Sequence, residues 1–178
     1  MALKEAIFGG GCFWCIDAAF RQLDGVVDTL CAYANGNLEK PDYKAVCTDT
    51  TGHAEVVKII YDDTKLSYRE LLEVFYSVHD PCTLNRQGAD YGSQYRSTIL
   101  WQREEERLVA EEVTAETEKS LGRKIVTKIE ALRCLYPAEE YHQNYFSKNP
   151  NHGYCRAVVA PKAAKVRALF PGKVRKER

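Results

Sequence analysis

The sequence lacks the features that mark a membrane protein or an exported protein. No stretch approaches the roughly 18 consecutive apolar residues that a membrane-spanning helix needs. The first eleven residues, MALKEAIFGGG, have neither the apolar core nor the cleavage pattern of a signal peptide. We therefore expect a cytoplasmic protein that has no contact with a membrane.

The chain also lacks net charge. Lys plus Arg and Asp plus Glu number 25 each, so the formal net charge is zero. A broad basic surface, which attracts nucleic acid or anionic lipid, is not expected from this balance. The one basic stretch is the C-terminal FPGKVRKER, which we interpret as a solvated end of the chain. We expect no nucleic-acid partner.

A second pair of closely spaced metal ligands is missing as well. The sequence has one CxxC, and no other pair among its seven cysteines or four histidines has the spacing of a zinc site. The odd number of cysteines, without an export signal, argues against a disulfide framework. We therefore expect free thiols and no metal. The cysteines are Cys12, Cys15, Cys31, Cys47, Cys82, Cys134 and Cys155.

What the sequence does contain is an alternation of strands and helices along 178 residues, the length of one ordinary domain. This order predicts an α/β (α+β) fold, a mixed β-sheet with packed helices. The last forty residues lack periodicity and predict an irregular segment that wraps over the domain, with 157–178 as a C-terminal tail. Strands are expected at 5–8, 26–33, 54–61, 95–101 and 125–131, and helices from Cys12, over 67–80 and over 103–120.

The segment GGGCFWC carries the first chemical signal. Cys12 follows a glycine turn and opens a helix, where unpaired N–H groups and the helix dipole are expected to lower the pKa of a thiol. Cys15 completes a CxxC, which also fits a thioredoxin-like redox helix. That fold requires a βα unit upstream, and only eleven residues precede Cys12. The intervening Phe13 and Trp14 suggest the wall of a small apolar pocket.

Three further segments offer reactive groups. Glu55 lies in the predicted strand 54–61; if buried it would have a raised pKa and act as a proton donor, but alternation alone favours the solvent face. The polar loop 82–94 leads into Tyr95 and includes Asp90. Cys155 lies in NPNHGYC, a sequence typical of a mobile turn, from which a thiol could travel to another sulfur.

Taken together, these segments resemble the methionine sulfoxide reductase A family. The motifs are GGCFWC, PDYKAVCTDTTGHAEVV, HDP, LNRQGADYGSQYRS, YPAEEYHQNY and KNPNHGYC, which fall in the family's order between residue 5 and about residue 156. The resemblance implies a ferredoxin-like two-layer sandwich core. It also implies an enzyme that reduces methionine S-sulfoxide, free or in proteins, with no metal or organic cofactor.

The resemblance implies particular roles. Cys12 would attack the sulfoxide sulfur and Glu55 would protonate its oxygen, since that oxygen leaves poorly until it is protonated. Tyr43 and Tyr95 would donate hydrogen bonds to the oxygen, and Asp90 would arrange the polar side of the pocket. Phe13 and Trp14 would hold the methyl group.

The resemblance further implies a sulfenic acid on Cys12, which a second thiol converts to a disulfide that thioredoxin reduces. Cys155 matches the family's resolving position and is favoured, and Cys15 is the alternative. The chain departs from the family at Asp17, where Glu is usual, and at Cys15, where Gly is common. We expect a monomer. The alternatives are a general thiol-disulfide oxidoreductase and a non-catalytic redox sensor.

Overall fold

The computed structural model describes residues 2–176 and is built on a six-stranded mixed sheet with the order β7-β6-β1-β3-β2-β8. All neighbouring strands are antiparallel except β6 and β7. The main strands are β1 (Leu3–Gly9), β2 (Val26–Ala34), β3 (Ala54–Asp62), β6 (Thr98–Trp101), β7 (Lys128–Ala131) and β8 (Leu135–Pro137), and a separate hairpin joins β4 (Arg86–Gln87) to β5 (Asp90–Tyr91).

Strand β3 lies in the middle of the sheet because it is apolar on both faces. Val57 and Ile59 point into the main core with the helices, and Val56 belongs to a second cluster on the opposite face. Leu132 and Leu135 of the chain leading into β8 pack against that second cluster. A strand buried on both sides is consistent with the β-branched run AEVVKIIY.

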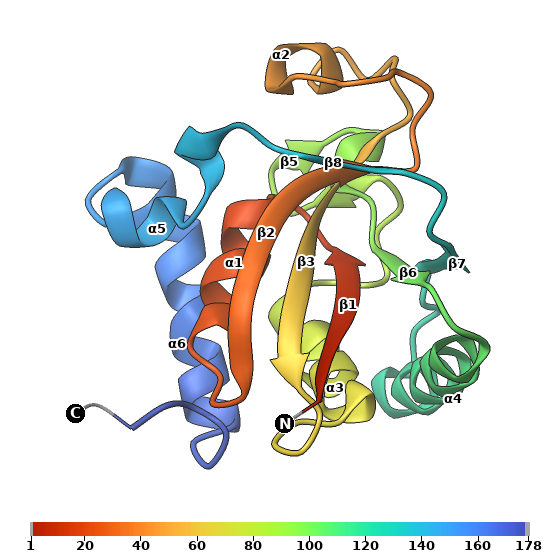
Figure 1. Cartoon of the computed structure of the whole chain (residues 1–178), viewed down its shortest axis with the longest axis vertical. Helices are drawn as coiled ribbons and strands as arrows, with labels where there is room; N and C mark the ends of the chain where they lie inside the picture. Colours follow the sequence, from red (N-terminus) through yellow and green to blue (C-terminus); the bar gives the residue numbers. More distant parts are fainter. Residues whose placement is uncertain (1, 177–178) are drawn as a thin grey trace.

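Helices α1, α3 and α6 lie on one face of the sheet and make the fold a two-layer structure (Figure 1). Contacts join α1 to α3 and α6, and α4 to α3 and β6. The six helices are α1 (Phe13–Arg21), α2 (Tyr43–Val46), α3 (Tyr68–Val78), α4 (Glu104–Leu121), α5 (Tyr145–Lys148) and α6 (Ala160–Leu169). The expected fold class, a mixed sheet with packed helices, is confirmed.

Local sequence explains where helix α3 begins. Ser67 has an extended backbone, and its hydroxyl accepts a hydrogen bond from the Glu70 N–H at 3.1 Å. This is half of the capping box that the sequence suggests. The Glu70 carboxylate turns away and binds Lys173 Nζ at 2.6 Å, so the start of α3 is tied to the C-terminal segment.

The C-terminal segment differs from the irregular tail that we expected after residue 157. Helix α6 follows a turn of π-helix at Cys155–Val159, and both pack against α1. Beyond α6, Leu23 and Val174 form an isolated β-bridge. The sequence signal for α6 is weak because only Ala163 and Val166 of its ten residues are buried. Within residues 2–176, no helix is long and apolar enough to cross a bilayer.

Candidate active site

Cys12 lies where β1 turns into α1. It is the N-cap residue, with φ −63° and ψ 130°, and it is partly exposed. Two positions of this turn, 9 and 11, require glycine. Gly11 has φ +87°, and a Cβ on Gly9 would lie 2.7 Å from the Glu55 carbonyl oxygen. The Gly11 N–H donates to the Tyr95 carbonyl at 3.1 Å, which joins this turn to the polar loop.

The structure corrects the expectation that the helix start lowers the pKa of Cys12. Burial raises the pKa of the Cys12 thiol well above its usual range, and the negative charges of Glu55 and Cys15 raise it further. The Trp14 backbone N–H at the helix start acts in the opposite direction. Desolvation therefore outweighs the helix terminus, and the Cys12 thiol is neutral at neutral pH.

Glu55 faces the helices. Its side chain is 1% exposed, and Phe13 N–H and Gln94 Nε2 donate to its two oxygens at 3.3 and 3.2 Å. Burial raises the pKa of Glu55 to about 8, although the hydrogen bonds from Gln94 and Phe13 act against this. The carboxyl is therefore protonated at neutral pH and lies beside Cys12, which is the state that a proton donor requires.

This raised pKa predicts a pH-dependent stability. The folded protein holds a proton that an unfolded Glu, with a pKa of about 4.5, has lost, so the stabilisation is complete below pH 4.5 and disappears as pH rises through 8. Linkage makes the loss on the order of 5 kcal/mol. Urea unfolding at pH 5 and pH 9 should therefore show that Glu55→Gln gains stability over the wild type at the higher pH. The exposed Glu105→Gln should show no such gain, and equal changes in both variants would contradict the assignment.

The polar side of the site is formed by Tyr43, Tyr95 and Asp90. Burial raises the pKa of both phenols, so both are hydrogen-bond donors at neutral pH. The charge of Asp90 also raises the pKa of Tyr95, which shows that the two side chains lie on the same side of the site. Tyr43 comes from α2, Asp90 from the β4–β5 hairpin and Tyr95 from the turn at Ser93–Tyr95. The structure thus brings together three residues that the sequence indicated.

The apolar side is an aromatic cluster built around the start of α1. The Phe13 ring is buried and lies 5.0 Å from the His142 ring. Trp14 is partly exposed, donates from Nε1 to His142 Nδ1 at 3.1 Å, and stacks on Tyr145 at 3.7 Å with an interplanar angle of 3°. The sequence indicated Phe13 and Trp14, but His142 and Tyr145 gave no signal beyond their place in an aromatic segment.

Cys155 is not in the mobile turn that its sequence suggests. It begins the π-helix, is fully buried, and shares a small apolar cluster with Cys15 and Val159. Tyr154 anchors this segment, because its hydroxyl donates to Asp90 Oδ2 at 2.7 Å and lies 4.0 Å from Cys15 Sγ. Asn, Pro and Gly before Cys155 do form an exposed turn, but that turn ends at residue 153.

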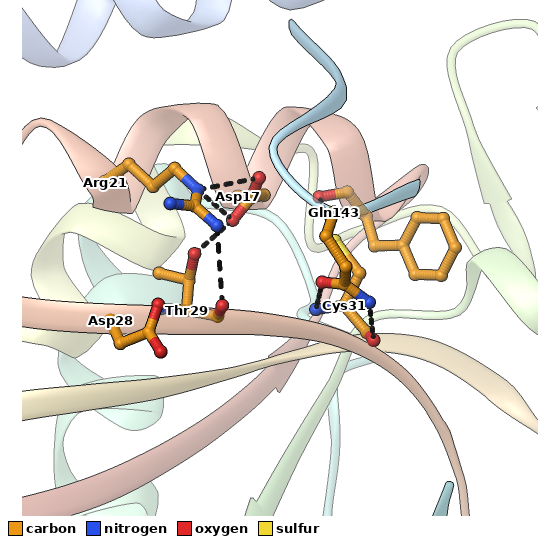
Figure 2. A network of polar contacts seen from close by, with 7 residues as sticks. Asp17, Arg21, Asp28, Thr29, Cys31 and Gln143 are labelled. Atoms are coloured by element: carbon orange, nitrogen blue, oxygen red, sulfur yellow. Dashed lines mark hydrogen bonds and ion pairs between the residues drawn. The ribbon is translucent and has the colours of Figure 1, made fainter. Parts of the chain in front are cut away.

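A buried polar network supports α1 from the side of β2 (Figure 2). Asp17 is 2% exposed, accepts from Arg21 Nε at 2.9 Å and forms a short hydrogen bond with the Thr29 hydroxyl. The Arg21 guanidinium also reaches the Thr29 carbonyl. The carboxylate at 17 therefore fixes α1 against β2, and it supports the helix that carries Cys12.

A second part of the same network holds Cys31 (Figure 2). Gln143 pairs with the Cys31 backbone through two hydrogen bonds of 2.8 and 3.0 Å. The Gln143 side chain therefore joins the segment before α5 to the middle of β2. Within residues 2–176, no group of three His, Cys, Asp or Glu side chains is arranged to hold a metal ion.

A partly exposed thiol at a helix start, beside a buried and protonated carboxyl group, is an arrangement typical of enzymes that act through a thiol. The family model for peptide methionine sulfoxide reductase matches residues 4–173. The chain belongs to the peptide methionine sulfoxide reductase family, as the sequence motifs indicated.

Individual relatives agree over nearly the whole length. MsrA of Saccharolobus solfataricus is 49% identical over 173 residues, which cover 97% of this chain and 98% of the relative. MsrA of Nautilia profundicola is 53% identical over 163 residues, which cover 92% of this chain and 94% of the relative.

Among solved structures, the reduced form of Mxr1 from Saccharomyces cerevisiae matches with a TM-score of 0.82 and 37% identity. The alignment covers 86% of this chain and 89% of that one. Mxr1 in complex with Trx2 matches with a TM-score of 0.58 and 25% identity, over 80% of this chain and 84% of that one.

Proposed function

We propose that the protein reduces methionine S-sulfoxide, free or within proteins, to methionine at Cys12. The observation that carries this proposal is the buried Glu55, with a pKa of about 8, beside the Cys12 thiol. A redox sensor or a general disulfide exchanger has no need of a protonated acid next to its nucleophile. A sulfoxide reductase does, because the oxygen must be protonated as the thiol attacks.

The groups around Cys12 fit the parts of a sulfoxide. The methyl group offers only apolar surface, which the Phe13 and Trp14 rings match. The oxygen would lie toward Glu55 and the phenols of Tyr43 and Tyr95, which can donate to it as its negative charge grows. Asp90, held by Tyr154, would keep the polar side in place.

In the reaction that we propose, Cys12 Sγ bonds to the sulfoxide sulfur while Glu55 delivers a proton to the oxygen. The bond between the two sulfurs then breaks as the oxygen passes to Cys12, which is oxidised to a sulfenic acid, and the sulfoxide sulfur is reduced to the thioether of methionine. The proton of the Cys12 thiol replaces the one that Glu55 gave up. A second thiol, Cys155 or Cys15, displaces water from the sulfenic acid and leaves a disulfide. This cycle needs no metal or organic cofactor.

We propose thioredoxin as the reductant of that disulfide. The likeness to Mxr1 in complex with Trx2 supports this choice. We further propose that residues 1–178 act as a single cytoplasmic domain and as a monomer, since one chain supplies all the described groups of the site. Residues 1, 177 and 178 lie outside the part of the chain that the structure describes.

An assay with pure stereoisomers tests the function. The protein is supplied with methionine S-sulfoxide or methionine R-sulfoxide, together with thioredoxin, thioredoxin reductase and NADPH, and both NADPH oxidation and methionine are measured. We expect one methionine per NADPH with the S epimer and at least about a hundredfold less with the R epimer. Equal rates on both epimers, or disulfide exchange on insulin without methionine formation, would contradict the proposal.

A further inference from the structure

Three thiols lie close together near the start of α1, so Cys12 has two neighbouring thiols and not one. Cys12 is the N-cap residue of α1, and Cys15 lies one turn further along the same helix. Cys155 comes from the π-helix that packs against α1. Cys15 is therefore on the same helix as the nucleophile and in the same buried cluster as Cys155.

The local backbone suits a bond between Cys12 and Cys15. The Cys15 N–H donates to the Cys12 carbonyl at 3.1 Å, so the two residues form one turn. Cys12 itself has an extended backbone, and its side chain is not held in the direction that a helical residue takes. Residues three apart on a helix are neighbours with Cβ atoms about 5 Å apart, close to the range that a disulfide spans.

Cys155 is held more firmly in place than Cys12. Cys155 is fully buried, and the residue before it is anchored by the hydrogen bond from Tyr154 to Asp90. Cys12 packs against the same cluster, so both Cys15 and Cys155 lie near the Cys12 thiol. Cys15 has the shorter path to Cys12, because both belong to one backbone turn and the segment that Tyr154 anchors need not move.

Cys155 instead is close to Cys15. Both thiols are fully buried and share the cluster with Val159, and the Tyr154 hydroxyl lies 4.0 Å from Cys15 Sγ. Burial raises the pKa of Cys15 to about 11, and the charges of Asp90 and Cys155 act in the same direction. The electrostatic coupling thus agrees with the packing.

We propose that Cys15 is the first thiol to condense with oxidised Cys12 and that Cys155 then takes over the bond, so that the final disulfide joins Cys15 and Cys155. The proposal rests on the function proposed above and deepens it. It makes Cys15 a catalytic residue, not a spare cysteine, and it assigns to Cys155 the second transfer.

Both steps balance without a further reagent. The Cys15 thiol attacks the Cys12 sulfenic sulfur, a 12–15 disulfide forms, and the hydroxyl leaves as water with the proton of Cys15. The Cys155 thiol then attacks Cys15 Sγ, the 12–15 bond breaks, and Cys12 leaves with the proton of Cys155 as a free thiol. Cys12 is restored before any external reductant arrives. Thioredoxin would then act on the 15–155 disulfide, and the residues on either side of Tyr154 and Cys155, 151–153 and Arg156, are exposed.

A single-turnover experiment tests the order of the bonds. The reduced protein is mixed with excess methionine S-sulfoxide without reductant and quenched by alkylation at intervals, and the disulfides are mapped by mass spectrometry. Dimedone traps any sulfenic acid that persists. Methionine is counted in every sample, so failure of the proposed function would appear as an absence of methionine, independently of which disulfide forms.

The wild type is expected to pass through a 12–15 disulfide and to end with a 15–155 disulfide and free Cys12. Cys155→Ser should stop at the 12–15 disulfide. Cys15→Ser should still form one methionine but should hold the Cys12 sulfenic acid at least about tenfold longer than the wild type. Cys134→Ser, which changes a thiol near the start of β8, should behave as the wild type.

Two results would overturn the proposal. One is a 12–155 disulfide that appears first in the wild type and at the same rate in Cys15→Ser. The other is a wild-type protein that forms methionine and ends at the 12–15 disulfide, with Cys155 free.

Discussion

Cys12→Ser is expected to abolish methionine formation, to below about a thousandth of the wild-type rate. A serine hydroxyl is far less nucleophilic than a thiol and cannot accept the sulfoxide oxygen as a sulfenic acid. The measurement is the formation of methionine from methionine S-sulfoxide with dithiothreitol as the reductant, which bypasses the other cysteines.

The loss must be separated from misfolding. Serine has nearly the size of cysteine, and Cys12 is only partly buried, so the free energy of unfolding should change little. Cys134→Ser, away from the start of α1, is the matched control and should retain full activity. If Cys12→Ser were folded and kept more than a hundredth of the activity, another residue would be the nucleophile.

Glu55→Gln is expected to reduce kcat/KM by about tenfold to ten-thousandfold, the range that general acid catalysis contributes. The amide has the same shape and can still accept from the Phe13 N–H, but it has no proton to transfer to the sulfoxide oxygen. Its effect should therefore fall on kcat more than on KM. Steady-state assays with dithiothreitol and varied methionine S-sulfoxide give both constants.

The comparison is Glu105→Gln, the same change at an exposed position of α4, which should leave both constants unaltered. An unchanged rate in Glu55→Gln together with an inactive Cys12→Ser would indicate that the thiol acts without this acid. A loss confined to KM would instead assign Glu55 to substrate binding alone.

Much of the fold could be predicted from local patterns. The β-branched run from residue 54 gave the central strand β3, and Ser67 with Glu70 gave the start of α3. The glycine run before Cys12 correctly placed that thiol at the beginning of a helix. These features depend on a few neighbouring residues, which is why the sequence alone was sufficient for them.

Other features depend on distant parts of the chain. Alternation could not decide which face of β3 carries Glu55, because residues 132–135 bury the opposite face as well. The pKa of Cys12 was expected to be low from its helix position, but tertiary burial reversed the direction. Cys155 was expected in a mobile turn, since nothing near it in sequence reveals that Tyr154 bonds to Asp90.

The position of Cys155 near the C-terminus has a consequence for the order in which the protein is made. Strand β1 is central and pairs with β3 and β6, so the sheet around Cys12 cannot close until residue 101 has been synthesised. The segment that brings Cys155 follows another 54 residues later, and domains complete their long-range contacts only as such segments emerge. A nascent chain that stops before residue 155 already carries Cys12, Cys15 and Glu55. Of the seven cysteines, Cys155 is therefore the last to be made, and its cluster with Cys15 forms only when synthesis is nearly complete.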